Sequence, residues 1–324
     1  MPHPLQPDSA IYVAGHRGLV GSAIVRALRH RGYPNLVTRT RDELDLLDQR
    51  AVAEFFAREQ PTAVMVAAAK VGGILANHTY RADFLYQNLQ IQNNVMWAAH
   101  AAAVHRLVFL GSSCIYPREA PQPMPESALL TGPLEQTNQA YAIAKIAGLE
   151  LVGALRAQHG RDWFSAMPTN LYGPGDNFHP TQSHVLPALI RRFHEAAAAG
   201  APEVVVWGSG KPLRELMHAD DCADAVVFLA ETLTDEHFAR LAPFSHVNVG
   251  SGDEVSIGDL ARLVADATGY RGQLRFDASK PDGTPRKLLD LSVLGSLGWQ
   301  RKIPLQRGIA ETVAWYRAQS STPP

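Results

Sequence analysis

Short apolar runs recur along the first half of the chain and alternate with stretches of helical periodicity. The runs 10–14, 63–69, 107–110 and 164–168 are rich in Val, Leu, Phe and Ala. Continuous apolar runs of this length are typical of strands buried on both faces of a parallel sheet. Because helical stretches separate them, the pattern predicts an α/β fold with a doubly wound parallel sheet of the Rossmann type.

A glycine-rich turn follows the first predicted strand. Its sequence is Gly15-His16-Arg17-Gly18-Leu19-Val20-Gly21, and the helix expected from residue 18 to 31 places Val20, Ile24 and Leu28 on one stripe. Glycines in such a turn let backbone N–H groups approach a pyrophosphate at a helix N-terminus. The spacing GxxGxxG is less specific than GxGxxG, so a plain strand-to-helix turn is the alternative.

The second predicted strand, near residues 36 and 37, lacks the acidic end that binds the ribose of NAD. It continues instead into Thr38-Arg39-Thr40-Arg41. A guanidinium forks onto phosphate oxygens, so these arginines, together with Arg17, favour the 2′-phosphate of NADP over NAD. The alternative is that Arg39 and Arg41 are solvated loop charges.

Tyr141 and Lys145 are four residues apart in a predicted helix, downstream of a serine-rich strand end that contains Ser112. Residues i and i+4 lie on one face of a helix, so the Lys145 ammonium is expected beside the Tyr141 phenol. A nearby cation and an oriented hydroxyl are expected to lower the phenol pKa and make it a working acid in hydride chemistry. An ordinary helix-surface pair is the alternative.

The segment order predicts two interleaved domains. Residues 1–172 are expected to form an NADP-binding domain. Segments within 215–250 are expected to return to it, namely a helix from Met217 to Glu231 and a strand from His246 to Gly250. Residues 173–214 and 251–324 are expected to form a smaller C-terminal domain that binds substrate. Within the first domain, Asp48 is predicted to cap a helix from Gln49 to Arg58.

Composition narrows the function classes. The chain has 324 residues, 46% of them hydrophobic, and a net charge of −1, which suits a globular enzyme and gives no nucleic-acid signal. No apolar run is long enough to span a membrane and Met1–Pro4 does not resemble a signal sequence, so a cytoplasmic location is expected. Two cysteines, Cys114 and Cys222, make no disulfide framework, and their spacing suggests no metal site.

Eight motifs, taken together, resemble those of the extended short-chain dehydrogenase/reductase family of nucleotide-sugar enzymes. The resemblance covers nearly the whole chain. The motifs are Gly15–Gly21, Ala67–Gly73, Gly111–Pro117, Tyr141–Lys145, Pro168–Pro174, Ser183–Val185, Val206–Gly210 and Lys280–Lys287.

The resemblance implies an NADPH-dependent enzyme acting on a GDP-sugar, GDP-4-keto-6-deoxy-D-mannose. Such an enzyme inverts C3 and C5 and then reduces C4. Protons alpha to a ketone are removable, so two such inversions need an acid/base pair, and the resemblance assigns it to Cys114 and His184. The alternatives are that Cys114 is a buried inert thiol and His184 an ordinary loop residue.

The resemblance also implies a full set of site residues. Catalysis is expected from Ser112, Cys114, Tyr141, Lys145 and His184. Substrate binding is expected from Arg192, Trp207, Arg214, Asp282 and Lys287. Cofactor binding is expected from Gly15, His16, Arg17, Gly18, Leu19, Val20, Gly21, Arg41, Leu110, Gly111, Ser112, Ser113, Lys145, Pro168, Thr169, Asn170, Leu171 and His184.

Two other functions fit parts of the pattern. One is a 4-epimerase or 4,6-dehydratase that retains NAD, against which the arginines after the second strand argue. The other is a non-catalytic NADP-sensing protein, against which the complete set of Ser112, Tyr141 and Lys145 argues. A homodimer is expected, because the helices predicted at 82–103 and 141–155 carry apolar residues on more than one face.

Overall fold

The computed structural model describes residues 5–180, 182–241, 244–280 and 282–320. Among these residues, six parallel strands form the central sheet in the order β2-β1-β3-β4-β5-β9. The strand order runs outward from β1 in both directions, to β2 on one side and to β3 on the other. This order is that of a doubly wound Rossmann sheet, which confirms the predicted fold class. The strands are β1 (Ile11–Ala14), β2 (Leu36–Val37), β3 (Ala63–Val66), β4 (Arg106–Leu110), β5 (Asp162–Pro168) and β9 (His246–Val249).

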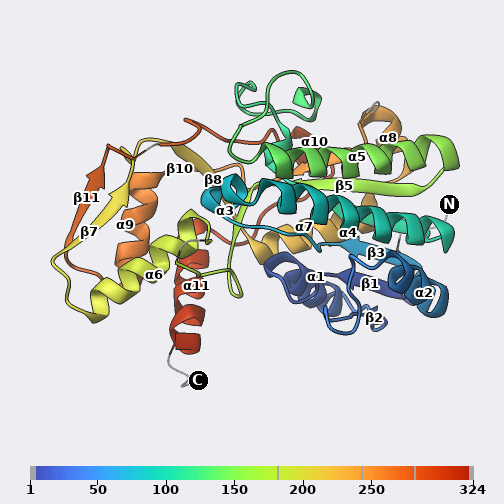
Figure 1. Cartoon of the computed structure of the whole chain (residues 1–324), viewed down its shortest axis with the longest axis horizontal. Helices are drawn as coiled ribbons and strands as arrows, with labels where there is room; N and C mark the ends of the chain where they lie inside the picture. The colour runs from blue at the N-terminus through green and yellow to red at the C-terminus, as the bar shows by residue number, and fades with distance from the viewer. Residues whose placement is uncertain (1–4, 181, 242–243, 281, 321–324) are drawn as a thin grey trace.

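Helices cover both faces of this sheet (Figure 1). Side chains alternate along a strand, so Ile11 and Val13 of β1 belong to one buried cluster, and Tyr12 and Ala14 to the other. The first cluster is completed by α1 (Leu19–His30) and α7 (Ala219–Thr232), and the second by α2 (Gln49–Glu59), α4 (Arg81–Ala101) and α5 (Gln139–His159).

A smaller part lies beside the sheet along the longest axis of the molecule (Figure 1). In the described residues it holds a three-stranded sheet in the order β10-β8-β6 and a parallel pair, β11 with β7. A third apolar cluster packs them against three helices. The elements are β6 (Asn170–Tyr172), β7 (Glu203–Trp207), β8 (Leu213–His218), β10 (Glu254–Ser256), β11 (Gln273–Asp277), α6 (Val185–Ala198), α9 (Ile257–Thr268) and α11 (Leu305–Ser320).

Short elements complete the described chain. They are α3 (Ile74–Thr79), the 3-10 helices η1 (Ser113–Ile115) and η2 (Glu126–Ala128), α8 (Asp235–Leu241) and α10 (Ser292–Ser296). None of the described helices is long and apolar enough to cross a membrane.

Two of the predicted boundaries that differ from the structure do so for a physical reason. The apolar run 63–69 is a strand only as far as Val66, because from Ala67 the backbone leaves the sheet and lines a cavity. The helix expected from Met217 begins at Ala219, because Met217 and His218 pair in β8 with β6. Apolar content alone did not distinguish a strand end from the loop or helix that follows it.

The N-terminus of α2 gives a first test of the fold. The Asp48 carboxylate accepts hydrogen bonds from the backbone N–H groups of Arg50 at 2.9 Å and Ala51 at 3.0 Å, as the sequence predicted. We expect Asp48→Ala to lower the free energy of unfolding by about 1 kcal/mol in urea titration. Asp48→Asn, which keeps an acceptor, is the control, and an equal loss in both variants would contradict a capping role.

Candidate active site

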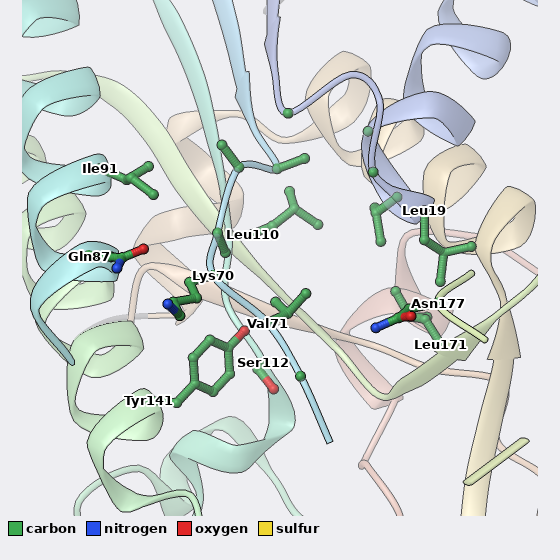
Figure 2. A pocket seen from close by; sticks show the side chains of 18 of the residues that line it. Leu19, Lys70, Val71, Gln87, Ile91, Leu110, Ser112, Tyr141, Leu171 and Asn177 are labelled. Carbon is green, nitrogen blue, oxygen red and sulfur yellow. The ribbon is translucent and has the colours of Figure 1, made fainter. Parts of the chain in front are cut away.

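A cavity of about 710 Å³ lies where five strands of the central sheet end. The segments that follow β1, β2, β3, β4 and β5 line it, and further residues come from the loop that follows β6. Carboxyl ends of parallel strands are the usual ligand-binding edge of such a sheet. Figure 2 shows Tyr141, Ser112 and Lys70 on one side of this cavity and Leu19, Leu171 and Asn177 on the other.

The glycine turn has the shape of a phosphate cradle. Gly15 has a φ of +83°, and a Cβ there would lie 2.7 Å from the backbone of Ala68. A Cβ on Gly21 would lie 2.1 Å from the carbonyl oxygen of Gly15. Gly18 is the N-cap of α1, and no side chain makes a capping hydrogen bond there. Backbone N–H groups at that N-terminus therefore remain accessible to an anion, and the residues present fit a dinucleotide pyrophosphate.

Lys145 is buried under the site. Its ammonium donates a hydrogen bond to the Leu110 carbonyl oxygen at 2.7 Å and lies 4.7 Å from the centre of the Phe109 ring. The same ammonium is 5.8 Å from the centre of the Tyr141 ring. The Tyr141 ring in turn packs edge-to-face on Phe84. Helix α5 thus brings Tyr141 and Lys145 to the end of β4, where Ser112 also lies.

The expected lowering of the Tyr141 pKa is wrong for this structure. Burial raises the pKa of Tyr141, and an electrostatic contribution from Cys114 raises it further. Burial also lowers the pKa of Lys145 to about 8, from an ordinary value of 10.5. The reason is desolvation, which disfavours the charged form of each group. The i, i+4 spacing gave the proximity of the pair but not the polarity of its surroundings.

Cys114 and His184 share one cationic neighbour, Lys287. Cys114 is 7% exposed and lies in η1, and its backbone N–H donates to the Ser112 hydroxyl at 3.4 Å. Burial raises the pKa of the Cys114 thiol, whereas Lys287 lowers it. Desolvation lowers the pKa of His184, and Lys287 adds to that effect. These shifts favour a neutral, protonated thiol on Cys114 and a neutral imidazole on His184, one nitrogen of which can accept a proton.

Most of the expected cofactor residues line the cavity. Exceptions among them are His16, Arg17 and Ser113, whose side chains are not part of its wall. Arg39 also lines the cavity, but its guanidinium is bound to Glu59 at 2.8 Å and lies over Phe55. The expected residues that line the cavity are Gly15, Gly18, Leu19, Val20, Gly21, Arg41, Leu110, Gly111, Ser112, Lys145, Pro168, Thr169, Asn170, Leu171 and His184.

The expected substrate residues lie outside the wall of this cavity. Arg192 donates to the Val205 carbonyl oxygen, and Trp207 is 64% exposed. The Asp282 carboxylate accepts bonds from Ser209, at 2.6 Å from its backbone N–H and 2.8 Å from its hydroxyl.

Lys287 lies near the catalytic candidates Cys114 and His184, and Arg214 lies near Lys287. Burial lowers the pKa of Arg214, with Asp282 opposing the effect. Burial likewise lowers the pKa of Lys287, and its electrostatic neighbours include Cys114 and Arg214. Pro281, in the motif that contains Asp282 and Lys287, falls outside the described residues.

Several cavity residues were not selected from the sequence. The loop after β6 contributes Asp176, Asn177 and Gln182, and helix α3 contributes Asn77. Burial raises the pKa of Asp176 to about 7, although the Asn177 backbone N–H donates to one of its oxygens. The sequence just before Asp176, Gly173-Pro174-Gly175, predicts a tight turn, but it does not indicate a ligand-binding residue. Lys70, to which the sequence gave no role, also lines the cavity.

Comparison with known proteins matches this geometry. Residues 11–250 match the model of the NAD dependent epimerase/dehydratase family. The chain belongs to this family. The matched region contains the glycine turn, Ser112, Tyr141, Lys145 and His184, so the family match and the cavity involve the same part of the chain.

Relatives extend the match over almost the whole length. The chain is 61% identical to a putative GDP-L-fucose synthase of Arabidopsis thaliana, covering 96% of this chain and 93% of the relative. It is 58% identical to the GDP-L-fucose synthase of Escherichia coli K12, covering 94% and 96%. A solved GDP-mannoheptose C4 reductase from Campylobacter jejuni with NADP bound is 38% identical, with a TM-score of 0.88 and coverage of 97% and 99%.

The burial of Lys145 gives a pH-dependent prediction. Its folded pKa of about 8 lies below the ordinary 10.5, so the buried charge destabilises the fold below pH 8, and that cost disappears as pH rises from 8 to 10.5. The shift corresponds to about 3 kcal/mol. We therefore expect wild-type protein to gain stability, relative to Lys145→Met, between pH 7 and pH 10.

Urea unfolding at the two pH values measures this difference. Lys211→Met, at an exposed position, is the control for the loss of a lysine. A stability difference between wild type and Lys145→Met that is constant over this pH range would contradict the assignment of a buried, destabilised ammonium.

Proposed function

We propose that the chain catalyses the NADPH-dependent 3,5-epimerisation and 4-reduction of GDP-4-keto-6-deoxy-D-mannose to GDP-L-fucose. The observation that carries this proposal is a cavity lined by Ser112, Tyr141, Lys145 and His184. Cys114 is not part of the cavity wall, but its backbone N–H donates to the Ser112 hydroxyl, and it shares the electrostatic neighbour Lys287 with His184. Ser112, Tyr141 and Lys145 suit the reduction of a ketone, and Cys114 and His184 suit proton exchange at the adjoining carbons. The names of the two GDP-L-fucose synthases that match over almost the whole chain support the same reaction.

In the reduction, the protein supplies a proton and a polarised environment. NADPH, when bound, supplies the hydride that reaches C4. The Ser112 hydroxyl orients the C4 oxygen, and the Tyr141 phenol gives it a proton. Burial raises the pKa of Tyr141, so the phenol keeps its proton until negative charge develops on the substrate oxygen. The Lys145 ammonium, fixed by the Leu110 carbonyl, stabilises the phenolate that remains.

In the epimerisation, Cys114 and His184 move protons at C3 and C5. One group removes a proton alpha to the ketone, giving an enolate, and the other returns a proton to the opposite face. The thiol and the neutral imidazole suit this exchange because one carries a proton and the other accepts one. Lys287, a cation near both groups, stabilises whichever anion forms.

NADP is the proposed cofactor. The glycine turn with His16, Arg17 and Ser113 nearby, the segments 110–112 and 168–171, Lys145 and His184 form the proposed binding surface. Arg41 is exposed at the cavity wall and is available for a 2′-phosphate, whereas Arg39 is engaged by Glu59. The relative with NADP bound supports this choice.

Substrate binding is proposed for the smaller part. Arg192, Arg214 and Lys287 supply cations for the diphosphate, Asp282 an acceptor for sugar hydroxyls and Trp207 a surface for the nucleoside. This assignment follows the proposed division into two domains. Residues 1–172 and segments of 215–250 form the cofactor-binding domain, and residues 173–214 and 251–324 form the substrate-binding domain. The match to relatives that act on GDP-linked sugars, by their names, supports it.

We also infer a cytoplasmic homodimer. Helices α4 and α5 carry large apolar side chains with high exposure, namely Tyr86 at 65%, Trp97 at 56% and Ile143 at 42%. Exposed apolar groups of this size on neighbouring helices suit a two-fold interface.

Deuterium exchange tests the epimerase half of the proposal. Enolisation needs no hydride, so wild-type protein in deuterated water, without NADPH, is expected to exchange the protons at C3 and C5 of the substrate. Cys114→Ser should lose about 10² of this rate or more, because a hydroxyl is a far weaker acid and base than a thiol near neutral pH. Mass spectrometry of the recovered sugar measures the exchange.

Cys222→Ser is the control, since Cys222 is also a buried free cysteine but packs in the core beside α1. Unaltered exchange in Cys114→Ser would remove Cys114 from the mechanism. Absence of exchange in wild-type protein would overturn the proposed epimerisation.

The cofactor preference has its own test. If Arg17 and Arg41 hold the 2′-phosphate, replacing both with Ala should raise the KM for NADPH about tenfold or more and leave the KM for NADH nearly unchanged. Arg50→Ala, which removes an exposed arginine bound to Glu54, is the control. An equal change for NADPH and NADH in the double variant would exclude a 2′-phosphate contact.

A further inference from the structure

Glu215 is a carboxylate with no exposed surface at the boundary between the two parts of the molecule. It lies in β8, is 0% exposed, and takes part in none of the ion pairs of the described residues. Burying a carboxyl group without a cation is costly unless hydrogen bonds compensate. Burial accordingly raises the pKa of Glu215, whereas its hydrogen bonds oppose that rise.

The side chain of Glu215 holds two backbone segments from different parts of the sequence. One carboxylate oxygen accepts a hydrogen bond from the Gly252 backbone N–H at 2.9 Å, and the other accepts one from the Leu289 backbone N–H at 3.0 Å. The backbone N–H of Glu215 also donates to the Lys287 carbonyl oxygen at 3.2 Å. Glu215 therefore binds the backbone on both sides of Leu288, at Lys287 through its N–H and at Leu289 through its carboxylate.

The neighbouring backbone is shaped around this carboxylate. Gly250 has no side chain, and a Cβ built there would lie 2.2 Å from a Glu215 carboxylate oxygen. An alanine at this position would collide with Glu215 before anything else nearby. The absence of a side chain at Gly250 is thus explained by the carboxylate beside it.

The other edge of the 287–290 segment is held by the loop that follows Cys114. The Met124 backbone N–H donates to the Leu288 carbonyl oxygen at 2.8 Å, and the Asp290 N–H donates to Met124 at 2.9 Å. The Gln122 side chain accepts from the Leu288 N–H at 2.8 Å. The segment that carries Lys287 is therefore fixed between Glu215 and the loop 122–124.

The backbone carbonyl of Glu215 faces the cofactor side. It accepts hydrogen bonds from the Thr169 hydroxyl and the Asn170 side-chain amide, both at 3.3 Å. Both residues line the cavity. One residue thus connects the proposed cofactor segment, through its backbone carbonyl and a contact of its carboxylate with Thr169, with the proposed substrate segment, through its carboxylate.

From this arrangement we propose that Glu215 is a positioning residue that sets Lys287 against the reacting sugar and the GDP diphosphate. The inference rests on the proposed function, because it takes Lys287 as a substrate cation. A carboxylate is required, since it offers acceptors to both N–H groups, whereas an amide would turn an NH₂ group toward one of them. Loss of the Leu289 bond loosens the 287–289 backbone and with it the cation that Cys114 and His184 share.

Isothermal titration with GDP and with NADPH, separately, tests the inference. Glu215→Gln is expected to weaken GDP binding about tenfold, the worth of a hydrogen bond to a charged group, and to slow C3 and C5 exchange. NADPH binding should stay within about twofold, since the backbone carbonyl that contacts Thr169 and Asn170 is retained. Glu203→Gln, an exposed carboxylate of β7 paired with Arg275, is the matched control.

Gly250→Ala is a second route to the same effect, because it displaces the carboxylate without removing it. It should reproduce the selective loss of GDP affinity, and the double variant should be no weaker than Glu215→Gln alone, because the two changes act on one contact. Circular dichroism and thermal unfolding serve as controls that each variant is folded. A double variant in which the losses add would contradict the inference.

The outcomes separate the two proposals. If wild-type protein binds GDP and both single variants bind it equally well, Glu215 does not position Lys287, and the proposed function stands. If the variants lose GDP and NADPH affinity to the same extent, Glu215 is a general structural residue and the inference is wrong. If wild-type protein does not bind GDP, the proposed function and the inference both fail.

Discussion

The hydrogen bond from the buried Lys145 ammonium to the Leu110 carbonyl oxygen holds the proposed catalytic groups together. It joins α5 to the last residue of β4, so Tyr141, one helical turn earlier, lies next to Ser112, which follows the strand. Lys145 is 3% exposed and sits over the Phe109 ring. An ammonium in such a place destabilises the fold, and retaining it makes sense only where its charge serves chemistry.

The elements that local sequence could predict are those whose physics is local. Buried parallel strands need continuous apolar runs, the glycine turn needs residues without Cβ atoms, and Asp48 needs only two N–H groups of its own helix. The fold class and the edge of the sheet where the site lies followed from them. Boundaries such as the end of β3 at Val66 did not, because apolarity continues into the cavity wall.

Properties that depend on distant segments could not be predicted in this way. The spacing of Tyr141 and Lys145 gave their proximity, but the direction of the Tyr141 pKa depends on how deeply the sheet and α4 bury both groups. Glu215 shows the same limit, since its carboxylate partners Gly252 and Leu289 are 37 and 74 residues away in sequence. In the sequence it is one glutamate among several. Its burial and its two backbone partners distinguish it.

Burial also gives the two proposed half-reactions a common logic. Desolvation raises the pKa of Tyr141 and Cys114 and lowers that of His184 and Lys145, so each group is driven toward its neutral form. A neutral phenol, thiol and imidazole do not repel or trap the charge that arises when a ketone becomes an enolate or an alkoxide, whereas Lys145, with a pKa of about 8, still carries its charge at neutral pH. That transient anion is then stabilised most strongly by nearby cations in a weakly polar site, which makes the exact placement of Lys287 as important as its charge. The buried carboxylate of Glu215 holds the backbone that sets this placement.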